Sequence, residues 1–482
     1  MTKKEKMSYW LAGLILCLLA WPPSPFNFII FLSNFPIYYA FLKIEKARSA
    51  FTFLYSFFFV FLLIKSLSLF AEGDYSSTML IGLFLAPIFW TLPFIPVYIV
   101  RRRIGLLASL LTLIIAVSLH EYWQYYWELS FNWYTLGLSL GNRDLASPLY
   151  QVLSINGLSI LILITNSICV FLWDKYTVKL KWRFLAFSTI LALSLISIIN
   201  LEQDKAKGED KIEIIAFSPS TEDYSAIENK LPAQIDYLVE RIEKEDIKGP
   251  TLLVGPESYL QDLRNNPIFV NRLNENEMIK RLQKVCDQRS ISMVFGAILV
   301  ELIPANDYPS FTAKKKEDGL YFEVYNGSIY LQPLKKADWR SKRVLLPFTE
   351  SIPFAKNINQ AAKRFSWIPR FDNTYGIDRN DRPYTYQGKN FITSVCYESL
   401  YPHIIEQKNH TKDLKFHLIL TNDWTRDSNT IQQYQSYCHA IVKSTKIPAL
   451  YVGMDKTSIF LDFPTNRVSL NEFEFSQIEI VN

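Results

Sequence analysis

The sequence predicts a multi-span α-helical membrane domain followed by an α/β domain. Residues 1–200 hold 15 basic and 8 acidic residues around long apolar runs, whereas residues 201–482 hold 36 and 38. Beyond residue 210, β-branched and aromatic runs alternate with segments of helical periodicity, which is typical of a layered α/β fold. This split excludes a simple soluble globule, and the 49% share of hydrophobic residues excludes a disordered chain.

The first 200 residues contain seven apolar runs. A bilayer core requires about 20 apolar residues per helix, so we expect residues 1–200 to form a transmembrane domain of about seven helices. The runs are 8–21, 25–42, 50–71, 78–100, 104–120, 152–173 and 183–200. No small-residue cleavage site follows the first run, so we expect that run to be retained and not removed as a signal peptide.

Basic residues gather in every second segment between these runs. The clusters are Lys3, Lys4 and Lys6; Lys43, Lys46 and Arg48; Arg101, Arg102 and Arg103; and Lys175, Lys179, Lys181 and Arg183. The intervening segments hold one basic residue between them, Arg143. Because positively charged loops stay in the cytoplasm, we expect the amino terminus inside and residues 201–482 on the far side of the membrane.

The segment EYWQYYWELSFNWYTLG (121–137) carries eight aromatic residues and no stretch long enough to span a bilayer. Such rings favour the membrane interface, where an apolar body meets water. Two interpretations remain open for this segment. It is either a surface-lying or re-entrant anchor, in which interfacial water solvates His120, Glu121 and Glu128, or a wall of a lipid-binding cavity.

The polar stretch LEQDKAKGED (201–210) is the expected linker to an α/β domain of residues 211–482. No hydrophobic run follows that domain, so we expect it to be tethered at its amino-terminal side. We predict strands at 211–217, 251–254, 291–299, 321–332, 391–396, 416–421, 449–453 and 457–462, and helices at 227–245, 275–288, 399–408 and 429–444.

Charge and motif content exclude several classes of function. The excess positive charge lies in short clusters between apolar runs, so we expect no nucleic-acid binding. The histidines form no pair at metal spacing, and the chain has neither a Cys-x-x-Cys motif nor a phosphate-binding glycine loop. We therefore expect no metal and no cofactor. Three cysteines lie outside the apolar runs, so at least one thiol should stay free.

Two polar segments place charges after predicted strands, where α/β sheets present their ligands. TLLVGPESYL (251–260) carries Glu257, although an isolated glutamate at a strand end equally caps a helix. WRSKRVLLPFTESIPF (339–354) carries Lys342 and Glu350, which are alternatively solvated surface charges.

In a third segment, FITSVCYESLYP (391–402), Cys396 lies at the end of the predicted strand 391–396 and begins a turn that continues with Tyr397 and Glu398. A thiol at the amino terminus of a helix has a lowered pKa and is a nucleophile near neutral pH, whereas a lone cysteine is otherwise a buried, inert residue. The position therefore makes Cys396 the candidate nucleophile among the thiols outside the apolar runs.

Glu, Lys and Cys in this order on successive strand ends resemble the nitrilase, or carbon–nitrogen hydrolase, superfamily, whose fold is an α-β-β-α sandwich. With the apolar runs in front, the chain is similar to the apolipoprotein N-acyltransferase family. The matching motifs are GPES at Glu257, SKRVLLPFTESIPF at Lys342 and Glu350, Cys396-Tyr397-Glu398, TNDWTRDSN (421–429) and Tyr325-Asn326. The chain departs from the family by lacking a final transmembrane helix and in the segments 437–446 and 452–458.

The resemblance implies that the protein transfers an acyl chain from a phospholipid to the N-terminal amine of a diacylglyceryl-modified apolipoprotein, through a cysteine thioester. It implies a monomer in the bacterial inner membrane with its catalytic domain on the periplasmic side. The implied roles are Glu257 as base, Lys342 as oxyanion partner and Cys396 as nucleophile, with Glu350, Tyr397 and Glu398 in support.

Two other functions compete with acyl transfer. A membrane-tethered, nitrilase-like amidase would resolve the thioester with water on a small amide. An acyltransferase instead needs apolar loops at the mouth of the site, and the candidates are Trp339, Phe348, Phe354, Phe365, Trp367 and Phe371. A non-catalytic scaffold would be expected to lack at least one of Glu257, Lys342 and Cys396, so their joint presence counts against it.

Overall fold

The computed structural model covers the whole chain. It describes residues 1–66, 76–143, 146–175, 211–304, 310, 312–316, 319–364, 375–377, 382–406, 413–423, 428–454, 459–461 and 475–481. The chain divides into two compact units: a helical unit of Met1–Gln203 with Arg426–Lys446, and an α/β unit of Asp204–Thr425 with Ile447–Asn482. The expected linker at 201–210 and the apolar run at 183–200 lie outside the described residues.

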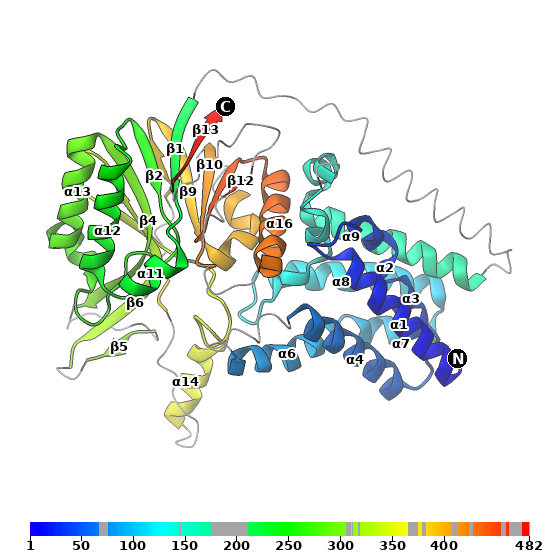
Figure 1. Cartoon of the computed structure of the whole chain (residues 1–482). Coiled ribbons are helices and arrows are strands. Elements are labelled where there is room, and N and C mark those ends of the chain that lie inside the picture. The colour runs from blue at the N-terminus through cyan, green and yellow to red at the C-terminus, as the bar shows by residue number, and fades with distance from the viewer. Residues whose placement is uncertain are drawn as a thin grey trace. The chain divides into compact units, whose positions relative to one another are not determined.

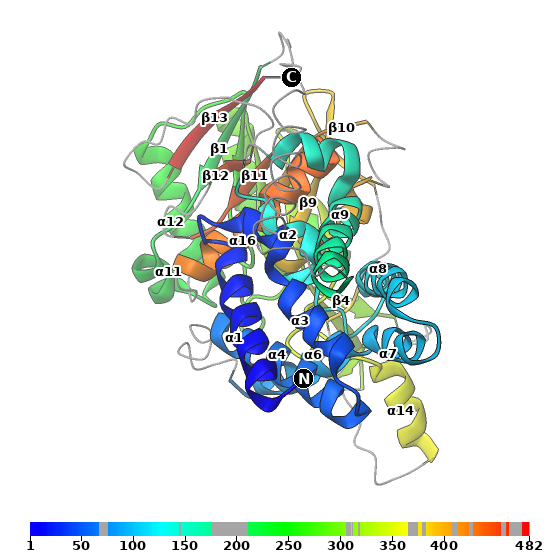
Figure 2. The same cartoon turned by 90° about the vertical axis from the view of Figure 1, so that its right-hand side faces the viewer.

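The helical unit is built mainly from apolar helices (Figures 1 and 2). Its α-helices are α1 (Lys3–Ala20), α2 (Ile30–Ser33), α3 (Phe35–Lys43), α4 (Ala47–Lys65), α6 (Ser76–Thr91), α7 (Phe94–Arg103), α8 (Leu106–Gln124), α9 (Ser147–Lys175) and α16 (Ser428–Thr445). Short 3-10 turns lie at Asn27–Ile29, Asn132–Tyr134 and Leu136–Leu140. Helix α1 packs against α3 and α4, as Figure 2 shows.

Four helices of the described chain are long and apolar enough to cross a membrane: Ala47–Lys65, Leu80–Arg103, Leu106–Gln124 and Ser147–Asp174. These coincide with the apolar runs at 50–71, 78–100, 104–120 and 152–173. The run at 8–21 lies in α1, whose first turn is charged. The run at 25–42 is divided at Asn34 into α2 and α3, each too short to span a bilayer alone.

The α/β unit contains two sheets. The first has the strand order β13-β1-β2-β4-β6-β5, with β3 paired to β4 and β7 paired to β6. Its strands are β1 (Lys211–Phe217), β2 (Thr251–Val254), β3 (Ile268–Phe269), β4 (Ile291–Ile303), β5 (Lys314–Lys315), β6 (Tyr321–Leu331), β7 (Asp338–Ser341) and β13 (Phe475–Val481). Strands β1, β2 and β4 run parallel, whereas β6 returns antiparallel to β4.

The second sheet has the order β12-β11-β10-β9-β8. Its strands are β8 (Tyr384–Tyr386), β9 (Lys389–Val395), β10 (Leu414–Leu420), β11 (Ala449–Val452) and β12 (Ile459–Leu461). Strands β9, β10 and β11 are parallel, so their carboxyl ends lie at one edge of the sheet.

Alternating residues of β1 explain how the α/β unit is layered. Ile212, Ile214 and Ala216 point into a core shared with Phe391, Leu418 and other residues of the second sheet. The opposite face, with Ile215 and Phe217, packs against the helices α11 (Thr221–Ile227), α12 (Leu231–Lys244) and α13 (Glu277–Arg289), as Figure 1 shows. A strand buried on both faces reads as a continuous apolar run, as Ile214–Phe217 of β1 does.

The predicted fold class is confirmed: apolar helices precede an α/β region with two sheets. The predicted strands at 211–217, 251–254 and 291–299 match β1, β2 and β4, although β4 continues to Ile303. The described chain also contains β7, which was not predicted because its sequence, DWRS, has little strand character. The helix expected at 399–408 begins earlier, as a 3-10 turn at Cys396–Leu400.

Candidate active site

Each predicted catalytic residue directly follows a strand of the α/β unit. Glu257 lies three residues after β2, Lys342 is the residue after β7, and Cys396 is the residue after β9. The strand holds the backbone of the residue that follows it, and the space beyond the strand end stays open for a substrate. A reactive side chain at a strand end is therefore both fixed and accessible. The two sheets, packed face to face, together supply all three residues.

A buried ammonium group lies at the centre of the site. The Lys342 side chain is 1% exposed, and its Nζ lies 2.8 Å from the Glu350 carboxylate and 3.9 Å from Glu257 Oε1. Glu350 Oε2 also accepts a hydrogen bond of 2.7 Å from Leu346 N, which holds this carboxylate in place. The structure thus brings together Lys342 and Glu350, which the sequence left as possible surface charges.

The side chain of Asn326 connects the two carboxylates. Its Nδ2 donates to Glu257 Oε1 at 2.8 Å and to Glu350 Oε1 at 3.0 Å. On the other side of Glu257, Oε2 accepts a bond of 2.9 Å from the backbone N of Asn422. The backbone O of Asn326 accepts from Lys342 N at 2.7 Å, so this residue of β6 positions all three charged groups.

The charges around Lys342 determine its protonation state. Burial lowers the pKa of Lys342, but the negative charges of Glu350, Glu257 and Cys396 together outweigh burial and raise the pKa above that of an ordinary lysine. The ammonium therefore stays protonated at neutral pH.

Cys396 occupies a strained turn. Its φ is 48°, in the left-handed region that residues with a Cβ rarely adopt, and the residue is buried. Such outliers persist where the surrounding structure holds them, and they concentrate at functional sites. Here the Glu398 carboxylate holds the turn, because it accepts bonds from Val395 N at 3.0 Å and from Arg343 N at 3.1 Å.

The supporting residues therefore act in different ways. Glu350 contacts Lys342 directly, whereas Glu398 ties the backbone after Cys396 to the backbone after Lys342. Tyr397 is buried, and its OH accepts a bond of 3.1 Å from Tyr401.

The aromatic residues proposed for the mouth of the site are only partly described. Trp339 is half-buried and packs on Tyr325 with ring centroids 5.3 Å apart. Phe348 and Phe354 lie in the loop after Lys342, both with positive φ. Phe365, Trp367 and Phe371 lie outside the described residues.

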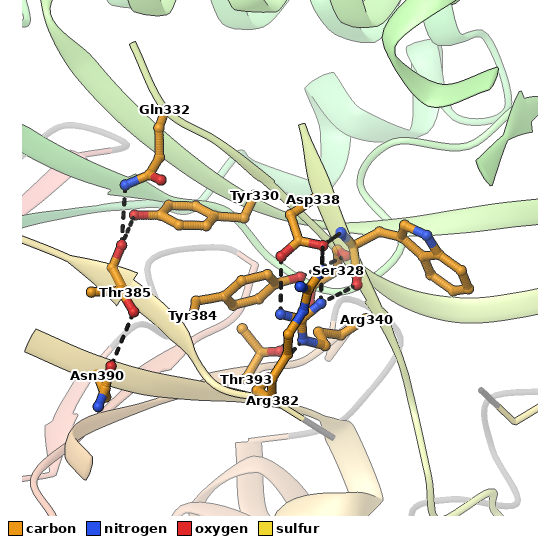
Figure 3. A network of polar contacts seen from close by, with 11 residues as sticks. Ser328, Tyr330, Gln332, Asp338, Arg340, Arg382, Tyr384, Thr385, Asn390 and Thr393 are labelled. Carbon is orange, nitrogen blue, oxygen red and sulfur yellow. Dashed lines mark hydrogen bonds and ion pairs between the residues drawn. The ribbon is translucent and has the colours of Figure 1, made fainter. Parts of the chain in front are cut away.

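A polar network joins the strands that carry Lys342 and Cys396 (Figure 3). Arg340 on β7 bonds both oxygens of Asp338 at 3.0 Å and lies 4.3 Å from the ring centroid of Tyr384 on β8. Ser328 on β6 bonds Thr393 on β9 at 2.9 Å. These contacts cross from the first sheet to the second, so they maintain the spacing between the two strand ends.

We predict that Arg340→Met lowers the stability of the α/β unit. The change removes a charge-assisted pair with Asp338, worth about 2 kcal/mol, and a bond of 2.8 Å to the backbone O of Arg382. Thermal unfolding in detergent should show a lower Tm for this variant, whereas Lys280→Met, which removes an exposed pair with Glu277, should leave the Tm unchanged. Equal Tm values for Arg340→Met and Lys280→Met would contradict a structural role for the network.

Gly296 on β4 lets the Glu257 loop approach the sheet closely. A Cβ at this position would lie 2.4 Å from Glu257 Cα and 2.5 Å from Pro256 O. Backbone bonds of 3.0 Å from Gly296 N to Pro256 O and from Leu260 N to Gly296 O hold the loop there.

We predict that Gly296→Ala displaces Glu257 and lowers turnover more than it lowers substrate binding. A misplacement of about 1 Å costs a reaction about 10²-fold in rate. Steady-state kinetics should therefore show a lower kcat at similar KM. Gly82→Ala is the control, because nothing lies within 4 Å of its added carbon. An unchanged kcat in Gly296→Ala would show that the position of Glu257 does not limit the rate.

Sequence reasoning missed two contributors to the site. Asn326 was part of a matched motif but had no role assigned, and Gly296 was not singled out. Asn326 is polar within a strand that is otherwise buried over Glu323–Leu331, which is the signal that could have identified it. No comparable signal marks Gly296, because its importance depends on how closely the Glu257 loop approaches.

The arrangement has the groups that acyl transfer through a covalent intermediate requires. It combines a thiol, a carboxylate that can accept a proton, and a buried positive charge that can stabilise an oxyanion. No group of three or more His, Cys, Asp or Glu side chains in the described part of the chain has the arrangement of a metal site.

Comparison with known family models finds a match in the first part of the chain. Residues 12–168 match the model of the Apolipoprotein N-acyltransferase N-terminal domain, which confirms the resemblance noted from the sequence. A search of curated proteins finds no match.

Several solved structures are similar to part of the chain. A CN-hydrolase superfamily protein from Xanthomonas campestris is 14% identical, with a TM-score of 0.38, over 56% of this chain and 91% of that protein. A nitrilase superfamily member from Saccharomyces cerevisiae is 15% identical, with a TM-score of 0.36, over 57% and 91%. An amidase from Nesterenkonia sp. AN1 is 11% identical, with a TM-score of 0.30, over 52% and 82%.

Proposed function

We propose that this chain, whose residues 12–168 match the Apolipoprotein N-acyltransferase N-terminal domain, transfers an acyl chain from a phospholipid to the N-terminal amine of a diacylglyceryl-modified apolipoprotein. The observation that carries the proposal is the buried Lys342 ammonium beside Glu257, in a unit where Cys396 directly follows strand β9. A thioester divides the transfer into two acyl substitutions of moderate difficulty.

In the first step, Glu257 accepts the proton of the Cys396 thiol, and the sulfur attacks the ester carbonyl of the phospholipid. The proton transfer keeps the summed charge around Lys342 constant, because the thiolate replaces a carboxylate. Lys342 stabilises the oxyanion of the tetrahedral intermediate. The intermediate collapses by breaking the ester C–O bond, and Glu257 returns its proton to the departing alkoxide, which leaves a lysophospholipid and an acyl-enzyme.

In the second step, the amine of the lipoprotein attacks the thioester carbonyl. Glu257 accepts a proton from the attacking nitrogen, Lys342 again stabilises the oxyanion, and the C–S bond breaks. The proton held by Glu257 passes to the departing Cys396 sulfur, and the product is an amide. The buried position of the triad supports this pathway, because water would otherwise hydrolyse the thioester.

The reaction explains why a catalytic unit is attached to apolar helices. Both the donor and the acceptor carry acyl chains and therefore lie in the bilayer. We propose a bacterial inner membrane location, with residues 201–482 on the periplasmic side and a monomeric enzyme. The alternating basic clusters between the apolar runs support this orientation.

We predict that a periplasm-dependent reporter fused after Asn482 is active in cells and that a cytoplasm-dependent reporter at the same site is inactive. The physical reason is the retention of positively charged loops in the cytoplasm. Reporters fused after Lys46 should give the opposite pattern. A cytoplasmic signal after Asn482 would reverse the proposed topology.

The function is tested with a reporter lipoprotein in cells depleted of this protein. The expected result is a lipoprotein that lacks one acyl chain by mass spectrometry, with the chain restored by the intact gene and not by a Cys396→Ala version. In vitro, release of free fatty acid from the acyl-enzyme without transfer to a diacylated peptide would instead favour an amidase-like hydrolase.

A further inference from the structure

The helical unit encloses a pocket that the proposed catalytic steps do not use. Counting the open solvent in front of it, the pocket holds about 730 Å³ of space. Side chains from α1, α3, α4, α6, α7 and α8 line it, together with the segment 131–136.

The walls of the pocket are mainly aromatic and aliphatic. Helix α4 contributes Phe57, Phe58 and Phe61, and Trp90 and Phe94 lie across from them in the lining. Such walls offer few hydrogen-bonding groups, so a fully polar ligand would lose its hydration without compensation. The lining therefore favours a ligand that is mostly hydrocarbon.

In helices α1, α7 and α8, the residues that line the pocket lie near the helix end that is distant from that helix's basic cluster. In α8, which begins just after Arg101–Arg103, the lining residues are Val117, His120, Glu121 and Gln124, in its last turns. Tyr122 and Trp123 at the same level of α8 are about half exposed, like the interfacial aromatic belt of a membrane protein. The pocket thus lies at the depth where lipid chains meet lipid head groups.

Glu121 is a buried carboxylate in this lining. The residue is 9% exposed, and its Oε1 accepts a bond of 2.9 Å from Leu136 N. Its Oε2 makes no hydrogen bond within the described part of the chain, although the Ser159 hydroxyl lies nearby. A buried carboxylate oxygen without a donor is costly, so this atom is suited to accept a bond from a ligand.

We propose that this pocket binds one long acyl chain of a membrane lipid, with Glu121 Oε2 accepting a hydrogen bond from an ammonium group at the polar end of that lipid. The proposal deepens the proposed function, because two of its substrates carry both features: an ethanolamine phospholipid and a diacylglyceryl peptide with a free amino terminus. The apolar walls hold the chain, and Glu121 distinguishes lipids that have an N–H donor from those that have none.

The test uses the full chain carrying Cys396→Ala, so that acyl-enzyme chemistry does not contribute. The protein is reconstituted in phosphatidylcholine vesicles with a phosphatidylethanolamine that carries a photoreactive diazirine on its acyl chain, and labelled peptides are identified by mass spectrometry. We expect saturable labelling of pocket residues. Val117→Trp should reduce this labelling several-fold, because the larger ring fills the pocket.

Leu111→Trp is the matched control, because the same change on the exposed face of α8 leaves the pocket open. Equal saturable labelling in Val117→Trp and Leu111→Trp, with both variants folded by thermal unfolding, would overturn the proposal. The labelling does not depend on catalysis, so a wild-type chain without acyltransferase activity would leave this result unchanged. The pocket proposal and the proposed function are therefore tested independently.

Glu121→Gln provides a second, isosteric test that preserves packing. Unlabelled phosphatidylethanolamine should compete with the probe better than phosphatidylcholine in the Glu121 protein, and the difference should shrink several-fold in Glu121→Gln. A preference unchanged by Glu121→Gln would overturn the role of the carboxylate. Competition by a diacylated peptide with a free amine, compared with its acetylated form, identifies which of the two lipid sources occupies the pocket.

Discussion

Incubating the protein with phospholipid should label Cys396 as a thioester, and Cys396→Ala should abolish both the label and turnover. Cys396 is the one thiol in the described part of the chain that directly follows a strand of the α/β unit. Removing a nucleophile that forms the covalent intermediate leaves no alternative route at this site. Digestion followed by mass spectrometry should give one acylated peptide, which hydroxylamine cleaves as expected for a thioester.

Cys286→Ala and Cys438→Ala are the matched controls for this experiment. Both thiols are buried in helices, in α13 and α16. These variants should keep the label and the turnover. An acyl group found on Cys286 or Cys438, or normal turnover in Cys396→Ala, would refute the assignment of the nucleophile.

The second prediction separates the two charged members of the triad. Glu257→Gln should fail to form the acyl-enzyme, because an amide does not accept the thiol proton, and a general base contributes about 10²–10⁴ in rate. Lys342→Met should slow both half-reactions by about 10²–10³, because each passes through an oxyanion. Single-turnover assays with labelled phospholipid, run apart from transfer to a diacylated peptide, measure the two steps.

Asp262→Asn is the matched control for Glu257→Gln. Asp262 is a buried carboxylate five residues along the same loop, and it bonds Asn265 N at 2.8 Å and the Asn266 side chain at 2.9 Å without contacting Lys342. Its amide variant should acylate at nearly the normal rate. If Glu257→Gln acylates normally but does not transfer, then Glu257 serves the amine alone, and the proton path proposed for the first step is wrong.

The sequence by itself determined the order of the two regions and predicted which residues form the candidate site. Apolar runs of bilayer length and the alternation of β-type and helical patterns are local properties, so they are readable without a structure. The position of Glu257, Lys342 and Cys396 after strands or in turns was likewise readable from short stretches. The roles assigned to these residues came from the family resemblance and remain predictions.

The tertiary structure decided how those groups are held. The 3.9 Å separation of Lys342 and Glu257, the bond from Asn326 to both carboxylates and the left-handed turn at Cys396 each depend on residues distant in sequence. The same is true of Gly296, which matters because the Glu257 loop approaches it within contact distance. Local patterns report which face of a strand is buried, whereas the distance between two strand ends depends on how whole sheets pack, and that packing is a property of the complete fold.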